Sequence, residues 1–137
     1  MTSNKVSILG GAALPVGKLQ GLSDAGTQHL EHEVLAKLIV EALADAGLEK
    51  EDVGSMILTL PRPYTQQKYF ATFMANYMRL PCDGLVMEVM GNGMTPALTF
   101  QTAVDQVRLG RTKVALALGI NFETGTPAPE HMMSSMR

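Results

Sequence analysis

The fold is decided by a stretch that begins Leu85-Val86-Met87-Glu88-Val89-Met90-Gly91-Asn92-Gly93-Met94-Thr95-Pro96. Its first five residues form a short, mostly apolar run that stops at glycines, which predicts a strand entering a loop. A helix is expected next, over residues 95–109, because proline is tolerated in the first helical turn and Gly110 supplies a stop. Residues 114–118, Val-Ala-Leu-Ala-Leu, then predict a strand of the continuous apolar kind found in sheets covered on both faces.

The same alternation extends towards the N-terminus. Residues 6–9 predict a strand ending at Gly10-Gly11, and residues 56–59 predict another, ended by prolines. Between them, apolar residues recur at helical spacing up to Gly47: Leu30, Val34, Leu35, Leu38, Ile39, Ala42 and Leu43. A further helix, capped by Thr65, carries a methionine and aromatic stripe: Tyr69, Phe70, Phe73, Met74, Tyr77 and Met78. The order β-α-β-α-β-α-β predicts an α/β fold, a mostly parallel sheet covered by helices.

Composition narrows the class of protein. The 137 residues are 46% hydrophobic and 18% charged, with a net charge of −2, which is typical of one soluble globular domain. The chain has no excess of basic residues, so its charge gives no indication of nucleic-acid binding. The single cysteine, Cys82, excludes an internal disulfide. No apolar run approaches the ~20 residues of a membrane span. The N-terminus shows no secretory pattern, so we expect a cytoplasmic protein.

Several segments together resemble the N-terminal half of the thiolase superfamily, which includes acetyl-CoA acetyltransferases. Residues 5–18 are similar to the family's first strand and Gly-Ala-x-x-Thr-Pro-x-Gly-Lys loop, and residues 42–53 to its next element. Residues 86–97 resemble its nucleophile loop and buried helix, and Arg108-Leu109-Gly110, Gly119 and Glu123 also fit. The resemblance covers about residues 5–125. It implies a thiolase-like α/β domain over residues 1–123, an irregular tail over 124–137, and acyl-CoA as ligand.

The chain departs from the family where the chemistry lies. Thiolases place a cysteine before the third helix, whose N-terminus stabilises the thiolate that takes the acyl group. By this resemblance Met90 occupies the cysteine position, and a thioether forms no acyl intermediate. Gly91, Asn92 and Gly93 are the expected substrate-binding residues, through their backbone N–H groups. The family's general-base histidine and second cysteine belong to a C-terminal half, and His29, His32 and His131 match neither.

Other residues that could have a function are better explained by a structural role. Cys82 lies at the far end of the expected strand, more than ~20 Å from the helix, so a packed thiol is preferred to a nucleophile. His29 and His32 are three residues apart on a helix, but no third metal ligand accompanies them, so we expect a solvated helix start and no metal. Gly10-Gly11-Ala12 lacks the spacing of a dinucleotide loop. The stripe of the second helix is either core or dimer interface.

Two functions therefore stay open. One is an acyltransferase relative that binds acyl-CoA, with no cofactor and with catalysis incomplete as given. The other is a non-catalytic thiolase-like subunit, a pseudoenzyme in a homo- or hetero-oligomer. We also expect one sheet face to be bare, because no helical pattern follows residues 114–118, and a bare face requires a partner or more chain.

Overall fold

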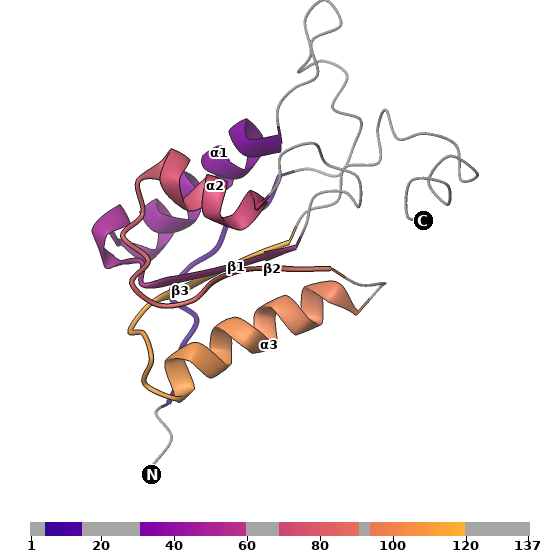
Figure 1. The fold of residues 1–137 in the computed structure, drawn as a ribbon. Coiled ribbons are helices and arrows are strands. Elements are labelled where there is room, and N and C mark those ends of the chain that lie inside the picture. Colours follow the sequence, from indigo (N-terminus) through magenta and orange to yellow (C-terminus); the bar gives the residue numbers. More distant parts are fainter. Residues whose placement is uncertain (1–4, 15–30, 60–68, 91–93, 120–137) are drawn as a thin grey trace, which may run out of the picture.

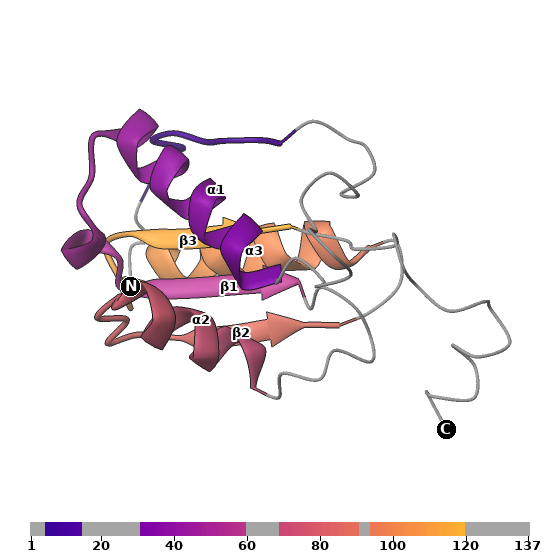
Figure 2. The ribbon, with the colours of Figure 1, turned by 90° about the horizontal axis from the view of Figure 1, so that it is seen from above.

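The computed structural model describes residues 5–14, 31–59, 69–90 and 94–119. In chain order they form α1 (Glu31–Ala46), the 3-10 turn η3 (Lys50–Asp52), β1 (Ser55–Thr59), α2 (Phe70–Met78), β2 (Val86–Val89), α3 (Thr95–Arg108) and β3 (Ala115–Leu118). The three strands are parallel, in the order β2-β1-β3. Helices α1 and α2 cover one face of this sheet and α3 covers the other (Figures 1 and 2). The predicted α/β class with a parallel, helix-covered sheet is confirmed.

The central strand is β1, which pairs with β2 along one edge and with β3 along the other. All five of its residues are buried, because neighbours enclose both edges and helices enclose both faces. Its side chains alternate between two cores of unequal size. Met56 and Leu58 join the large cluster beneath α1 and α2, whereas Ile57 joins Val89 and Ala103 beside α3. The α1–α2 side therefore holds most of the apolar core.

Helix α1 ends at the predicted glycine. Gly47 has a φ of 69°. The N–H of Leu48 donates to the carbonyl of Leu43 at 2.9 Å, and the N–H of Gly47 donates to that of Ala44 at 3.2 Å. These are the two bonds of a Schellman motif, which satisfies carbonyls at a helix end. Helix α3 ends in the same way at Gly110, whose φ is 72°.

The strand predicted at residues 114–118 is present as β3, and among the described residues it pairs with β1 alone and leaves Ala117 exposed. Two expectations need correction. Residues 6–9 are not a strand: the segment 5–14 is described and joins no sheet. No sheet face is bare, since α3 covers the side away from α1 and α2. The helix between β2 and β3 packs on the sheet face that we expected to be bare.

Within the described ranges, no helix is both long and apolar enough to cross a membrane. The boundary between the predicted domain, residues 1–123, and the predicted tail, residues 124–137, falls outside the described residues, as do Thr65 and His29.

Candidate functional site at the carboxyl edge of the sheet

The carboxyl ends of β1 and β2 mark a point where the chain changes sides. Thr59, the last residue of β1, is in register with Val89, the last residue of β2. The helix that follows β1, α2, lies on one face, and the helix that follows β2, α3, lies on the other (Figure 1). In open α/β sheets, connections that diverge in this way leave a crevice at the carboxyl edge, where ligands bind. Fold topology therefore points to this edge before any side chain is considered.

Met90 lies at this edge. It is the first residue after β2, and its side chain is 66% exposed. Only five residues separate the end of β2 at Val89 from the first helical residue, Thr95, so Met90 lies close to the mouth of α3. The structure thus places the predicted position 90 between a strand end and a helix N-terminus. It carries no ionisable group there.

The N-terminus of α3 offers hydrogen-bond donors and partial positive charge. Its N-cap residue, Met94, makes no capping hydrogen bond through its side chain, and the first turn contains no acidic residue. The first amides of a helix have no acceptor within it; in α3 Pro96 has no N–H, which leaves the amide of Ala97 as a donor of the first turn. The helix dipole adds about half a positive charge at this end. A thioester carbonyl or an anion is the kind of group that such an end binds.

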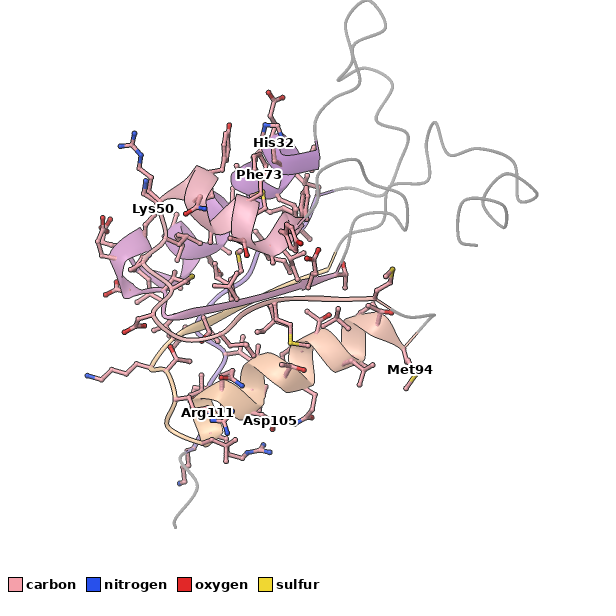
Figure 3. All side chains as sticks on the ribbon, viewed as in Figure 1. His32, Lys50, Phe73, Met94, Asp105 and Arg111 are labelled. Atoms are coloured by element: carbon pink, nitrogen blue, oxygen red, sulfur yellow. The ribbon has the colours of Figure 1, made fainter. Side chains whose placement is uncertain are left out.

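Sequence reasoning missed Met94. Its side chain is 63% exposed and stands at the amino end of α3 (Figure 3). Met90 and Met94 are therefore two exposed thioethers that flank Gly91, Asn92 and Gly93 in the sequence. Those three predicted binding residues lie outside the described residues. The sequence could have indicated Met94, because this residue directly precedes Thr95-Pro96, where the N-cap of the helix is expected.

Cys82 lies at the other end of β2, as predicted. Its backbone N–H donates to the carbonyl of Val53, ahead of β1, at 3.2 Å. Burial desolvates the thiolate and Asp83 adds a neighbouring negative charge, so the pKa of the Cys82 thiol is raised. A catalytic cysteine needs the opposite shift. The position of Cys82 at the other end of β2 and the direction of its pKa shift both argue against it as a substitute nucleophile at the carboxyl edge.

His32 belongs to an aromatic contact between α1 and α2. Its ring meets Phe73 edge-on at a centroid distance of 5.3 Å and Tyr77 at 4.7 Å (Figure 3). It is therefore partly packed, which differs from the solvated helix start that we expected. No set of three or more His, Cys, Asp or Glu side chains in the described ranges is grouped to hold a metal.

The stripe of the second helix is mainly core. Phe70, Met74 and Met78 are buried against α1 and the sheet, while Tyr69 and Tyr77 are exposed. The buried members account for the helical spacing of the stripe, and the dimer-interface alternative stays a prediction.

No protein-family model matches this chain. No curated protein matches it either. The functional interpretation therefore depends on the residues and on the geometry of the carboxyl edge.

Proposed function

We propose that this protein is a thiolase-like acyl-CoA-binding protein, related to acetyl-CoA acetyltransferases, that binds a thioester at the N-terminus of α3 without forming the covalent acyl intermediate. One observation carries the proposal: the exposed thioether of Met90 lies between the carboxyl end of β2 and the start of α3. A sulfur nucleophile at this point would face the donors and the positive end of a helix, which is the environment that lowers a thiol pKa. Methionine fills this place with a larger apolar side chain and removes the reactivity.

The binding step is separable from the chemistry. Pro96 has no N–H, so the donor offered to a thioester oxygen in the first turn of α3 is the amide of Ala97, and neither a capping side chain of Met94 nor an acidic residue of the first turn competes for it. Binding without turnover is therefore the expected behaviour of the chain. Binding precedes any covalent step of acyl transfer, so the loss of binding and the loss of acyl transfer are distinct results.

Calorimetric titration with acetyl-CoA tests the binding step. We expect saturable binding with a Kd between about 1 μM and 1 mM, the usual range for enzyme substrates. Met94→Glu places a carboxylate at the mouth of α3 and is expected to weaken binding at least several-fold, because it competes for the helix amides and repels the anionic ligand. Met94→Gln is the matched neutral control and should bind as the unmodified protein does. A folded protein that gives no saturable heat contradicts the proposal.

Restoring a thiol tests the assignment of position 90. Met90→Cys and Met94→Cys put a thiol at two comparably exposed positions, 66% and 63% in the original side chains. With acetyl-CoA, we expect intact mass to show one added acetyl group on Met90→Cys, with much slower acylation of Met94→Cys. Cys82, present in both, serves as an internal control that should stay unmodified. Equal rates at the two positions would mean that position 90 is not a nucleophile position.

The second function, a non-catalytic subunit paired with a thiolase-like chain, is favoured by a different observation. Leu98 and Phe100 of α3 and Leu109 at its C-cap are large apolar side chains that are exposed. Exposed apolar side chains of this size are typical of surfaces that associate. Sedimentation of the protein alone and mixed with a thiolase tests this role, and a monomer under both conditions argues against it.

A further inference from the structure

A cavity of about 460 Å³ lies along the outer edge of β3, the edge that faces away from β1. Leu38 and Ala42 of α1 line it on one side of the sheet, and Phe100 and Val104 of α3 line it on the other. Residues 5–12, which begin beside the amino end of β3, form its outer wall (Figure 2). We call this cavity the edge slot. Its volume falls in the range of small-molecule sites, roughly 300–1,000 Å³.

Small side chains on β3 leave room for the edge slot. Ala117 is in register with Ile57 of β1, and Ile57 belongs to the cluster beside α3. Residues in register on paired strands share a face of the sheet, so Ala117 faces α3. Ala115, two residues earlier, packs against the same cluster. Two methyl groups therefore stand on this face of β3, where larger side chains would fill the space towards α3.

The walls of the edge slot are apolar and partly open to solvent. Ile8 is 80% exposed, Leu9 is 57% exposed and Phe100 is 49% exposed, and all three line the edge slot. Large apolar side chains exposed around one cavity are typical of a ligand site. The edge slot follows residues 113–119, a stretch of roughly 20 Å in extended chain. An elongated hydrocarbon chain matches both this shape and these walls.

The charged residues of the lining are both cations. Among the described residues that line the edge slot, Lys5 and Lys113 carry charge, and none is an aspartate or a glutamate. Lys113 lies just ahead of β3, and Lys5 opens the segment that begins beside the amino end of that strand (Figure 2). Positive charge without a neutralising carboxylate in the lining attracts an anion to this end of the edge slot.

A backbone donor points out of the sheet at the same end. The carbonyl of Val114 accepts hydrogen bonds from the N–H of Gly54 at 3.0 Å and from the N–H of Ser55 at 3.3 Å, both on the β1 side. The C=O and N–H of a trans peptide unit point in opposite directions. The N–H of Ala115 therefore points away from β1, towards the outer edge. Ammonium groups and backbone N–H groups are the donors that a carboxylate accepts from.

We propose that the edge slot binds a free fatty carboxylate, with its hydrocarbon chain between α1 and α3 and its carboxylate at Lys5 and Lys113. The edge slot is bounded by β3, two helices and residues 5–12, so it suits a single hydrocarbon chain better than the paired chains of a membrane lipid. The inference does not rest on acyl-CoA binding, because the mouth of α3 lies beside β2, at the opposite edge of the sheet from β3.

Calorimetric titration of the whole protein with laurate, kept below the concentration at which micelles form, tests the site. We expect saturable binding of one laurate per chain. Lys113→Glu should weaken it about five-fold or more, because repulsion of the carboxylate replaces attraction. Lys50→Glu makes the same charge change at an exposed residue outside the lining and should bind laurate as the unmodified protein does. Acetyl-CoA binding should be the same in Lys113→Glu as in the unmodified protein, which separates this site from the mouth of α3.

Filling the edge slot tests where the hydrocarbon chain lies. Ala117→Phe puts a ring into the space beside α3 and should weaken laurate binding about ten-fold or more. Ala44→Phe is the matched control, since Ala44 is an exposed alanine of α1 outside the lining. Far-UV circular dichroism confirms that each variant keeps its helices. In amide hydrogen exchange, laurate should slow the exchange of residues 5–12 and 113–119 and leave that of α2 unchanged.

Three results would overturn the proposal. The first is a folded protein that gives no saturable heat with laurate. The second is equal laurate affinity in Lys113→Glu and Lys50→Glu, or protection by laurate that omits residues 113–119. The third is equally tight binding of dodecyltrimethylammonium, a cation with the same hydrocarbon chain, because the protein would then recognise only apolar surface and not a carboxylate.

Discussion

The backbone N–H of Leu80 donates a 2.9 Å hydrogen bond to the carbonyl of Ala75, and it does so across Arg79, whose φ is 55°. The N–H of Arg79 donates to Asn76 at 3.1 Å. α2 therefore ends in the same pair of bonds as α1 and α3, but with an arginine where the other two helices have glycine. The left-handed conformation costs a residue with a Cβ about 1–2 kcal/mol.

Arg79→Gly should stabilise the protein. It removes the strain at φ 55°, partly offset by the greater entropy that glycine has in the unfolded chain. We expect a gain of up to about 1 kcal/mol in the free energy of unfolding, measured by urea denaturation. Gly47→Ala is the matched reverse change, since nothing lies within 4 Å of a Cβ there and only the backbone resists. It should destabilise by about 1 kcal/mol, and the same sign for both variants would contradict this account.

Truncating Ile39 should cost far more than truncating its neighbour Val40. Ile39 is fully buried in the cluster between α1 and the sheet, whereas Val40 is exposed. We expect Ile39→Ala to lower the free energy of unfolding by about 2–5 kcal/mol and Val40→Ala to change it by no more than about 0.5 kcal/mol. Thermal or urea unfolding checks both. Similar losses would mean that α1 presents a different face to the sheet.

Asp45 should control the N-terminal segment locally rather than the stability of the whole fold. Asp45→Ala removes the acceptor for the N–H of Gly11, so exchange of that amide should become fast. Asp45→Asn keeps an acceptor oxygen and should keep most of the protection. The free energy of unfolding should shift by no more than about 1 kcal/mol in either variant, because the bond is exposed. Protection of Gly11 that survives Asp45→Ala would show that another group holds the segment.

The thiol of Cys82 should react slowly near neutral pH. Burial and Asp83 raise its pKa, so the thiolate fraction is smaller than in an unfolded peptide and alkylation by iodoacetamide should be slower. Asp83→Asn removes the charge and should speed the reaction at a given pH. Because the folded thiol has the higher pKa, its contribution to stability is complete below the unfolded pKa and is lost as pH rises through the folded pKa. Alkylation as fast as in the denatured protein would refute the assignment.

Much of the local structure was predictable from sequence. The apolar spacing of Leu35, Ile39 and Leu43 predicts α1, and Gly47 predicts its end. Both patterns depend only on residues close together in the sequence. The same holds for β2 and α3. For the candidate site, sequence located Met90 through a family resemblance, but it did not reveal the exposure of Met94 or the neighbours of His32.

The sequence by itself determined the types and order of the elements from α1 to β3 and the α/β class, since these follow from contacts within about one helical turn or one strand. Only the tertiary structure decided that β1 is central among the described strands, that the strand at 115–118 lies at an edge of that three-stranded sheet, and that residues 6–9 lie beside the sheet instead of within it. The physical reason is that strand pairing joins residues far apart in the chain. Which segment pairs with a given edge of the sheet depends on how much apolar surface each of several distant segments would bury there. No pattern among neighbouring residues contains this information.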